Sequence, residues 1–544
     1  MRGRLPWRVR SRRGAQGRRR GLRRRHRRAP LRGRRIPSAP GGGWLGALPQ
    51  PVDAAGGKAF VDFQHDVTTK DIQLATREGF HSIEHIKRFT TTGMATDQGK
   101  TSNLNALAIA AERLRKPLPE IGLTTFRMPF TPTTFGSFAG PSRGDLFDPV
   151  RRTPSHAWAA ERGAVFEPVS LWMRARYFPR DGEDMRAAVD RECLAVRRSC
   201  GLFDASTLGK IEIVGPDAAE FLNRLYVNNW STLAVGRCRY GILCRDDGFI
   251  YDDGVVARLA ADRFHVTTTT GGAARVLAMM EDYRQTEWTD LEVWLTSTTE
   301  QWAVIAVQGP NARRVVESVV TGADLSHAAL PHMALTRGSI ELEEIGAVPA
   351  LLFRVSFTGE LGYEINVPGA HGRAVWDKVY AAGQAHGITP YGTETMHVLR
   401  AEKGYIIVGQ DTDGTVTPDD AGLAWTIGKS KPDFVGKRSL QRPTMQASGR
   451  KQLVGLTCVS STVPLEEGAQ VVETRGQKPP MKMIGHITSS YHSAVLGKPI
   501  ALALVAGGRA RLGQRLFVPM PGGEIEVEVT SPVFYDEKGA RLNG

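Results

Sequence analysis

The chain has 544 residues, enough for three or four domains of about 150 residues each. An apolar fraction of 41% and a charged fraction of 23% are ordinary for a globular protein, and they exclude a fibrous or wholly disordered chain. The net charge of +15 comes from residues 1–57, which hold 17 of the 71 basic residues and one of the 56 acidic residues, so that 54 basic and 55 acidic residues remain elsewhere. A nearly neutral body argues against nucleic acid as its partner.

Residues 1–57 are predicted to be a disordered Arg-rich tail. With few apolar side chains, this stretch cannot bury enough surface to offset the entropy of ordering. Two interpretations stay open: an arm that binds RNA or DNA, or sequence translated from a start site upstream of the true one. The second is favoured, because the Arg-rich part has no aromatic residue beyond Trp7 and no repeating Arg-Gly-Gly pattern.

The sequence shows no secretory or membrane signal, and its cysteines have the pattern of a protein in a reducing compartment. No apolar core of signal-peptide length follows the Arg run, and no window approaches the ~18 apolar residues of a membrane span. The five cysteines are odd in number and form no Cys-x-x-Cys pair. We therefore expect a cytoplasmic protein with no membrane contact and no metal site.

The stretch 58–125 has the pattern of a short α/β piece. A strand at Phe60–Phe63 precedes one helix from Thr68 to about Arg88 and, after a loop, a second helix from Asn103 to about Arg115. This is short for an independent core, so we interpret it as the remnant of a larger domain. Residues 126–168 are rich in Pro, Gly, Ser and Thr, which predicts a linker or a strap laid over a surface.

An internal repeat identifies residues 169–440 as a duplicated α+β module. Its two units are the strand Lys210–Val214, Gly215-Pro216 and the helix Asp217–Leu225, and the strand Ala303–Val307, Gly309-Pro310 and the helix Asn311–Val320. Proline suits a first helical turn because its missing amide would have had no partner there. A cleft between two such halves is a natural ligand site.

Residues 445–544 differ in kind. Short strand-like runs, among them Leu453–Val459 and Ile500–Val505, are separated by Gly and Pro turns, which predicts a small antiparallel barrel or sandwich. The fold class expected for the chain is therefore α+β: a duplicated α+β module followed by a small antiparallel β-barrel, with an α/β remnant and a disordered tail at the amino terminus.

The first candidate for chemistry lies in the predicted hairpin Arg239–Leu259, which turns at Asp246-Asp247-Gly248. Strand alternation puts Asp253 on a face with Phe249, Tyr251, Val255, Ala257 and Leu259, whereas Asp252 shares the other face with Arg258. An unpaired carboxylate on an apolar face needs a donor, a cation or a raised pKa, as at many catalytic sites. A structural aspartate bonded to nearby backbone amides is the alternative.

A second hairpin, Leu351–Val367, turns at Thr358–Gly362. Tyr363, Ile365 and Val367 share one face, and Glu364 lies on the other with Asn366. Pattern alone favours a solvated face for Glu364.

Three other motifs carry little weight. His81-Ser82-Ile83-Glu84-His85 matches a zinc-protease pattern but lacks a third ligand. Gly99-Lys100-Thr101 resembles the end of a phosphate loop with the wrong glycine spacing and a helix in place of the leading strand. No Gly-x-Gly-x-x-Gly follows a strand, so a dinucleotide fingerprint is absent from the sequence.

Several segments resemble the aminomethyltransferase family of the glycine cleavage system. They include Asp246–Val256 (DDGFIYDDGVV), Ser356–Val367 (SFTGELGYEINV), Leu399–Asp411 (LRAEKGYIIVGQD) and Gly485–Val505. The resemblance covers about residues 170–540. The block Phe60–Asn103 is more specific, since it closely resembles the segment that joins the two halves of heterotetrameric sarcosine oxidase alpha subunits.

The resemblance implies a folate-binding module that captures the carbon released by sarcosine oxidation on tetrahydrofolate, giving methylenetetrahydrofolate. It implies that Asp253 is catalytic, that Glu364 contacts the pterin and that Tyr240 lines the pocket. An acidic group suits the adjacent donors of a pterin. An arginine of many family members corresponds to Met396, and an asparagine falls near Thr268–Thr269, changes that fit an oxidase-linked variant.

The resemblance also implies partners. A flavin-bearing beta subunit and small subunits would complete a heterotetrameric oxidoreductase, with FMN, FAD and NAD held elsewhere in the complex. The family's dinucleotide-binding half is missing from the sequence, so we expect a truncated gene product. Two further functions stay open: a stand-alone folate-dependent aminomethyltransferase or demethylase, and a non-catalytic assembly subunit.

Overall fold

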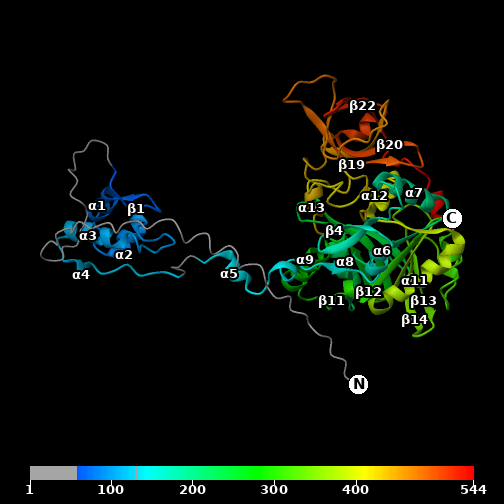
Figure 1. The fold of residues 1–544 in the computed structure, drawn as a ribbon, viewed down its shortest axis with the longest axis horizontal. Helices are drawn as coiled ribbons and strands as arrows, with labels where there is room; N and C mark the ends of the chain where they lie inside the picture. Colours follow the sequence, from blue (N-terminus) through cyan, green and yellow to red (C-terminus); the bar gives the residue numbers. More distant parts are fainter. Residues whose placement is uncertain (1–57, 129–132, 544) are drawn as a thin grey trace, which may run out of the picture. The chain divides into compact units, whose positions relative to one another are not determined.

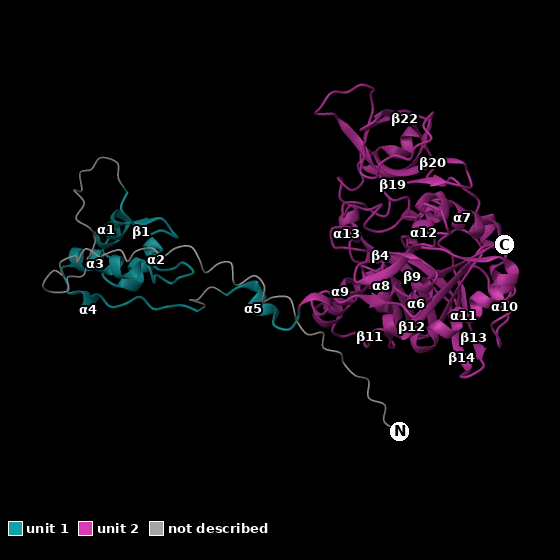
Figure 2. Ribbon diagram, viewed as in Figure 1, with its two compact units in different colours: residues 1–142 teal, residues 143–544 magenta. Residues whose placement is uncertain are grey.

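The computed structural model describes residues 58–128 and 133–543. The chain divides into two compact units, residues 1–142 and residues 143–544 (Figure 2). The tail predicted at residues 1–57 lies outside the described part of the chain. Each unit buries its own apolar side chains.

The first unit is a small α/β body (Figure 1). Its elements are β1 (Phe60–Asp62), β2 (Val67–Thr68), α1 (Thr69–Arg77), α2 (Ile83–Thr90), α3 (Asn103–Leu114), α4 (Leu118–Ile121) and α5 (Phe135–Ala139). The single helix predicted from Thr68 to Arg88 is wrong. The chain breaks between α1 and α2 at Gly79, whose φ of +95° lies in the left-handed region that a continuing helix cannot use. Ile72, Ile86 and Leu107 centre a small apolar cluster.

The second unit opens with a short three-stranded sheet. It contains η1 (Gly144–Leu146), β3 (Arg151–Arg152), α6 (His156–Glu161), β4 (Val165–Val169) and β5 (Trp172–Tyr177), and the strand order is β3-β5-β4. The range predicted as a linker, 126–168, thus includes regular elements. Trp158 of α6 is buried against Trp376, which ties this sheet to the module that follows.

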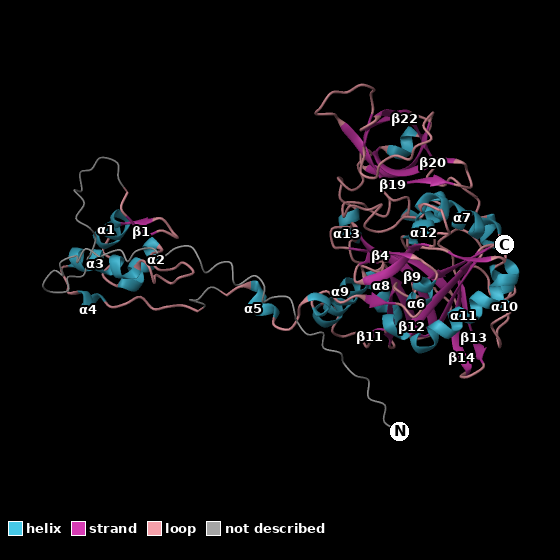
Figure 3. Ribbon diagram, viewed as in Figure 1, coloured by secondary structure: helices cyan, strands magenta, loops and turns pink. Residues whose placement is uncertain are grey.

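The module consists of two mainly antiparallel sheets with helices beside them (Figure 3). The five-stranded sheet has the order β11-β7-β10-β9-β8, and the six-stranded sheet has the order β13-β14-β15-β12-β6-β16. Its strands are β6 (Cys200–Asp204), β7 (Gly209–Val214), β8 (Cys238–Cys244), β9 (Ile250–Ala260), β10 (Arg263–Thr268), β11 (Trp294–Ser297), β12 (Trp302–Gln308), β13 (Ala334–Leu342), β14 (Gly346–Arg354), β15 (Gly362–Pro368) and β16 (Ile388–Pro390). Its helices are α7 (Met185–Arg198), α8 (Ala218–Leu225), α9 (Ala273–Thr286), α10 (Ala312–Glu317), α11 (Gly372–Gly383), α12 (Thr393–Glu402) and α13 (Lys437–Leu440), with 3-10 turns η2 (Thr299–Gln301), η3 (Gly369–His371), η4 (Gln384–His386) and η5 (Ala424–Thr426).

The predicted duplication is visible in these sheets. The unit β7–α8 belongs to the five-stranded sheet and the unit β12–α10 to the six-stranded sheet. The prolines precede the helices instead of starting them, because α8 begins at Ala218 and α10 at Ala312. The glycines are the constrained positions: Gly215 has φ +140° and Gly309 has φ +129°, and a Cβ on either would meet backbone at 2.2 and 2.6 Å.

The two sheets meet at one edge. An isolated bridge pairs Arg237, just before β8, with Ala334 of β13. Behind this bridge an apolar cluster joins Cys238 and Ala257 of the first sheet to Leu351 and Phe353 of the second. The strands β8 and β9 therefore pack against β14, and β15 lies beside β14 in the second sheet.

A closed six-stranded antiparallel barrel completes the fold, in the order β17-β20-β19-β18-β21-β22 (Figure 1). Its strands are β17 (Lys451–Cys458), β18 (Gln470–Val472), β19 (Met483–Ser493), β20 (Lys498–Ala506), β21 (Arg515–Met520) and β22 (Gly523–Thr530), with η6 (Gly508–Arg511) and η7 (Ala540–Asn543). The predicted α+β class with a carboxyl-terminal barrel is confirmed. In the described residues no helix is long and apolar enough to cross a membrane.

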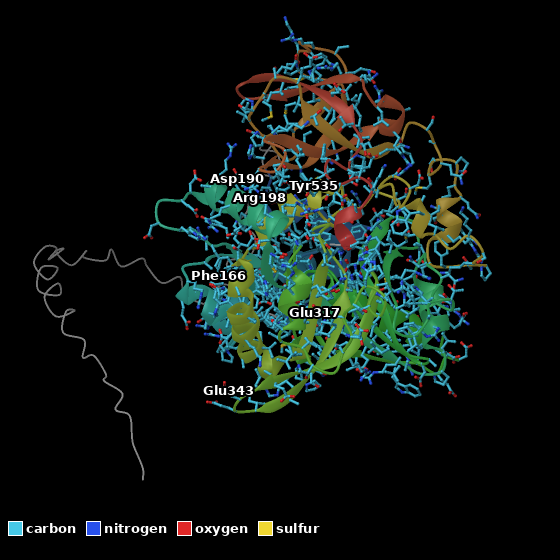
Figure 4. The ribbon with its side chains drawn as sticks, turned by 90° about the vertical axis from the view of Figure 1, so that its right-hand side faces the viewer. Phe166, Asp190, Arg198, Glu317, Glu343 and Tyr535 are labelled. Carbon is cyan, nitrogen blue, oxygen red and sulfur yellow. The ribbon has the colours of Figure 1, made fainter. Side chains whose placement is uncertain are left out.

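The chain end returns from the barrel to the module. Tyr535 lies close to the end of α7, where Figure 4 labels it near Arg198. The Arg197 guanidinium stacks over the Tyr535 ring at 4.4 Å, and Arg197 also forms buried ion pairs with Glu360 and Glu402 at 3.0 and 2.6 Å. These contacts hold α7, α12 and the segment before β15 together.

Candidate functional site

The hairpin of β8 and β9 carries two neighbouring aspartates. Strand pairing sets Ile242 opposite Asp253 and Leu243 opposite Asp252. A bulge near the turn shifts the register, so Ile250 packs with Ile242, and Tyr251 packs with Leu243. The alternation predicted from the sequence therefore holds from Asp252 onward and is reversed before it, which separates Tyr251 from the face of Asp253.

Asp253 forms a direct hydrogen bond with Tyr240. The Tyr240 hydroxyl donates to Asp253 Oδ2 at 2.6 Å, across two adjacent strands. Burial raises the pKa of Asp253 to about 7, while the hydrogen bond from Tyr240 opposes this rise. Burial, together with the charge of Asp253, raises the pKa of Tyr240, so the phenol keeps its proton and remains the donor.

Asp252 is the more deeply buried of the two carboxyls, with no exposed surface. Asp252 shares its strand face with Arg258 as predicted, but the two do not pair: Arg258 donates to the carbonyls of Leu233 and Ala261 at 2.9 and 2.6 Å. Asp252 accepts from the Asp253 amide at 2.9 Å and from Thr269 Oγ1 at 3.1 Å. It is thus a fully buried acid bonded within its own hairpin and to the segment before α9.

Glu364 lies on β15, the strand between β14 and β12. Its neighbours on the pairing strands are Phe353 and Ala306. The face that it shares with Asn366 is not solvated, since Asn366 is only 3% exposed, and the interpretation favoured by pattern alone is wrong. Burial raises the pKa of Glu364 to about 7, and the charge of Lys210 opposes this rise.

Within residues 58–128 and 133–543 no side chain or amide donates a hydrogen bond to the carboxyl of Glu364, although the charge of Lys210 acts on it. The nearby Lys210 ammonium is occupied by the carbonyls of Ser206 and Leu208 at 2.7 and 2.8 Å. A half-buried carboxyl without protein donors is free to accept hydrogen bonds from water or from a ligand.

Cys238 relates Glu364 to the Asp253–Tyr240 pair. The charge of Glu364 contributes to the raised pKa of the Cys238 thiol, after burial, so the two groups lie within electrostatic range. Tyr240 is two residues further along the same strand as Cys238, and hence points from the same face. The structure therefore brings Asp253 and Tyr240 into contact. Glu364 lies beside Phe353, which packs against the sheet face that carries this pair, and Glu364 has no direct bond to either residue.

Trp425 is a residue that the sequence analysis did not single out. It lies in η5, in a loop with no periodic pattern, and its side chain is 69% exposed. Its ring centroid lies 6.4 Å from that of Tyr240, at an interplanar angle of 31°. An exposed tryptophan beside a half-buried Tyr–Asp pair is a platform on which a flat ligand can stack.

The two positions where the sequence departs from the resembled family have structural roles. Met396 is buried in an apolar cluster with Ile406 and Tyr491. Thr269 binds Asp252, and it also accepts from the Gly272 amide at 3.0 Å.

The zinc-like and phosphate-loop motifs are occupied by local structure. His81 precedes α2, which begins at Ile83, and Glu84 pairs with Arg88 at 2.8 Å and accepts from the Thr125 amide. Asp97 accepts from the Gly99 and Thr101 amides, which closes the Gly99–Thr101 turn on itself. Among the described residues no group of three or more His, Cys, Asp or Glu could hold a metal ion.

A small cavity lies beside β6, away from the hairpin. It has space for about one water molecule, about 20 Å³, and its polar lining includes Ser155, Arg174 and Asp204. Asp253, Tyr240 and Glu364 are not among its lining residues. This cavity is therefore distinct from the predicted pterin site.

Comparison with known proteins matches three domain families in chain order. Residues 56–141 match the sarcosine oxidase A3 domain, residues 155–431 the GCVT N-terminal domain and residues 451–536 the glycine cleavage T-protein C-terminal barrel domain. The chain is 52% identical to the sarcosine oxidase subunit alpha of Corynebacterium sp. (strain P-1) over 491 residues, 89% of this chain and 50% of that protein. The chain thus spans about half the length of the sarcosine oxidase relatives that it matches.

The module and barrel also match shorter proteins over nearly their whole length. The aminomethyltransferase of Streptomyces coelicolor is 34% identical over 391 residues, 71% of this chain and 98% of that protein. The solved structure of the glycine cleavage system aminomethyltransferase T from Bartonella henselae superposes with a TM-score of 0.61 at 26% identity, covering 71% of this chain and 99% of that one. The chain therefore belongs to the aminomethyltransferase family of the glycine cleavage T-protein, in the form that follows a sarcosine oxidase A3 domain.

Proposed function

We propose that the module of residues 155–536 binds a reduced folate and transfers to it the carbon released by oxidation of sarcosine, giving methylenetetrahydrofolate. The proposal rests on one arrangement. The Asp253–Tyr240 pair lies on the sheet face that packs against β14, the strand beside Glu364, and the Glu364 carboxyl accepts no hydrogen bond from the described residues. Trp425 is exposed beside Tyr240.

Glu364 fits the pterin end of a folate. A pterin carries an amino group and a ring N–H side by side, and a carboxylate can accept from both. The Glu364 carboxyl is half-buried and receives no hydrogen bond from the part of the chain that the structure describes, so a ligand with two adjacent donors would satisfy it. The ring of Trp425 suits the aromatic middle of the same ligand.

Asp253 fits the reacting end. Tetrahydrofolate supplies two neighbouring amine nitrogens that one carbon can bridge, and closing that bridge releases a proton from nitrogen. A carboxyl with a pKa of about 7 is a more effective proton acceptor near neutral pH than an ordinary aspartate. Tyr240 holds this carboxyl in place through Oδ2 and leaves Oδ1 available to the folate.

The relatives support sarcosine as the source of the carbon and support the partners of this proposal. The 52% identity to a sarcosine oxidase subunit alpha, together with the A3 match, supports assembly with a flavin-bearing beta subunit and small subunits. We place FMN, FAD and NAD elsewhere in such a complex and tetrahydrofolate on this chain.

Binding can be tested by calorimetric titration with 5-formyltetrahydrofolate, which is stable in air. We expect saturable binding by the wild type and about 10- to 100-fold weaker binding by Glu364→Ala, because hydrogen bonds to a charged group are lost. Glu343→Ala is the matched control, since Glu343 is an exposed glutamate in the β13–β14 turn (Figure 4). Absence of saturable binding by the wild type would contradict the proposal.

Transfer can be tested in the assembled complex supplied with sarcosine and tetrahydrofolate. The ratio of methylenetetrahydrofolate to free formaldehyde is the measurement. Asp253→Asn should keep folate affinity within a few fold and shift the product toward free formaldehyde. An unchanged ratio would remove Asp253 from the reaction.

A second candidate is a stand-alone folate-dependent aminomethyltransferase or demethylase. The observation that favours it is the match along 98% of a shorter aminomethyltransferase. Transfer by this chain without any flavin-bearing subunit would support it. A non-catalytic assembly subunit is the outcome if folate does not bind.

A further inference from the structure

We propose that Asp252 is a positioning residue for Asp253: it anchors the Asp253 main chain and holds a second negative charge on the opposite face of the same strand. The inference deepens the proposed function and rests on it for its catalytic meaning. The contacts themselves do not depend on any ligand.

Both carboxylate oxygens of Asp252 accept hydrogen bonds that fix its position. Asp252 Oδ1 accepts from the Asp253 amide at 2.9 Å, and Asp252 Oδ2 accepts from Thr269 Oγ1 at 3.1 Å. Thr269 Oγ1 in turn accepts from the Gly272 amide at 3.0 Å, at the start of α9. This chain of bonds ties the main chain at Asp253 to the amino terminus of a 14-residue helix.

Gly272 shows how closely the helix start approaches Asp252. A Cβ at this position would lie 1.7 Å from Asp252 Oδ2 and 2.6 Å from Thr269 Oγ1. Only glycine leaves room for this approach. The positive end of the helix dipole then lies beside the buried carboxyl and helps it to remain ionised.

Among the described residues, two tyrosines and one arginine act on the two acids. Tyr240 faces Asp253 from β8, Tyr226 faces both carboxyls from the segment after α8, and Arg275 of α9 acts on Asp252 alone. Burial raises the pKa of both acids, and the charge of Asp252 raises that of Asp253 further. Arg275 and Thr269 oppose the rise for Asp252, so the negative charge is favoured on Asp252 and the proton on Asp253.

The catalytic consequence is a more basic Asp253. With Asp252 ionised, Asp253 takes up a proton more readily, which suits a group that accepts a proton from a folate nitrogen. Asp252 itself points to Thr269 and α9, and it acts only through Asp253.

The test measures protonation of Asp253 without folate. Protein labelled with 3-fluorotyrosine gives a ¹⁹F resonance for Tyr240, assigned by its loss in Tyr240→Phe, and the pH midpoint of its shift reports the carboxyl that the hydroxyl contacts. We expect a wild-type midpoint near 7. Asp252→Asn keeps an acceptor for the Asp253 amide and removes the charge, so its midpoint should fall by about one pH unit.

The control is Asp246→Asn, which removes the same charge from the exposed tip of the same hairpin and should leave the midpoint unchanged. Thr269→Val is the second variant. It removes the donor that stabilises ionised Asp252, so the midpoint should fall in the same direction by a smaller amount. Thr269→Val decides the matter if Asp252→Asn does not fold.

If the pH midpoint of Asp252→Asn equals that of the wild type, the inference is overturned and Asp252 is a structural residue only. The same holds for the midpoint of Thr269→Val if Asp252→Asn does not fold. Because no folate is present, that result leaves the proposed function standing. Conversely, if the midpoint falls in the variants while the wild type fails to bind folate, that result would contradict the proposed function and still support the electrostatic coupling of the two acids.

Discussion

Tyr240 and Asp253 are joined by a 2.6 Å hydrogen bond between neighbouring strands, with the phenol as donor. The two residues stand on a diagonal of the β8–β9 pairing, since Tyr240 pairs with Val255 and Asp253 with Ile242. Diagonal side chains on one face are within reach of a long aromatic residue. The bond therefore depends on the strand register that the turn at Gly248 and its bulge set.

Tyr240→Phe should move the pH dependence of carbon transfer to higher pH. The hydrogen bond from Tyr240 stabilises the ionised carboxylate, so its loss raises the pKa of Asp253 further above about 7. We expect the acidic limb of the pH–rate profile to shift upward by about one pH unit. Tyr283→Phe is the control, because Tyr283 donates to Asp246 at the exposed hairpin tip. A shift of the limb toward lower pH would contradict the assignment of Tyr240 as donor.

Glu364→Gln should stabilise the fold at pH 8 and weaken folate binding. Burial raises the pKa of Glu364 from 4.5 to about 7, so the folded state holds a proton that the unfolded state releases between these values. Its contribution to stability is therefore complete below about pH 4.5 and is lost as the pH rises through 7. Urea unfolding should give the variant about 1 to 3 kcal/mol more stability than the wild type at pH 8 and equal stability at pH 4. The control is Glu343→Gln, whose side chain is exposed and which should show neither change. If Glu364→Gln and the wild type are equally stable at pH 8, the Glu364 carboxyl is not buried enough to have a raised pKa.

Trp425→Ala should weaken 5-formyltetrahydrofolate binding by about tenfold, because a stacking surface beside Tyr240 is removed. Folding should be unaffected, since the side chain is 69% exposed. Trp294→Ala, on edge strand β11 and 59% exposed, is the matched control. Calorimetry of the three proteins checks this, and equal affinities would place the ligand elsewhere.

Arg197→Ala should destabilise the second unit by about 3 to 5 kcal/mol, because it leaves the Glu360 and Glu402 carboxylates buried with a lost partner. Arg198→Ala tests the neighbouring exposed arginine on the same helix (Figure 4) and should change the free energy of unfolding by less than about 0.5 kcal/mol. Urea unfolding monitored by tryptophan fluorescence is the measurement. Similar midpoints for the two variants would show that the ion pairs are not needed.

Local signals predicted much of this molecule. The Asp-Asp-Gly turn, the two strand–Gly-Pro–helix units and the Gly- and Pro-punctuated strands of the barrel all lie where the sequence indicates, because turn chemistry and side-chain periodicity act over a few residues. The break at Gly79 was missed because amphipathic spacing continues across it.

The surroundings of the acids could not be read in this way. Strand alternation isolated Asp253 and set Asp252 on the opposite face, but it could not show that Asp252 is fully buried, and for Glu364 it favoured a solvated face although that side chain is half-buried. A strand's pattern shows which side chains share a face, but whether that face meets water depends on the sheet or helix packed against it. Trp425 was missed for a related reason, since a loop residue has no periodicity and its position beside Tyr240 exists only in the folded chain.

By itself, then, the sequence determined most of the elements from residue 169 onward, the duplication and one carboxyl worth testing. Only the tertiary structure decided that Asp252 is fully buried and bonded to the Asp253 amide, that Tyr240 donates to the Asp253 carboxyl and that no described residue donates to Glu364. The physical reason is that burial and charge–charge distance are properties of residues distant in the chain, and these properties set the pKa of each acid.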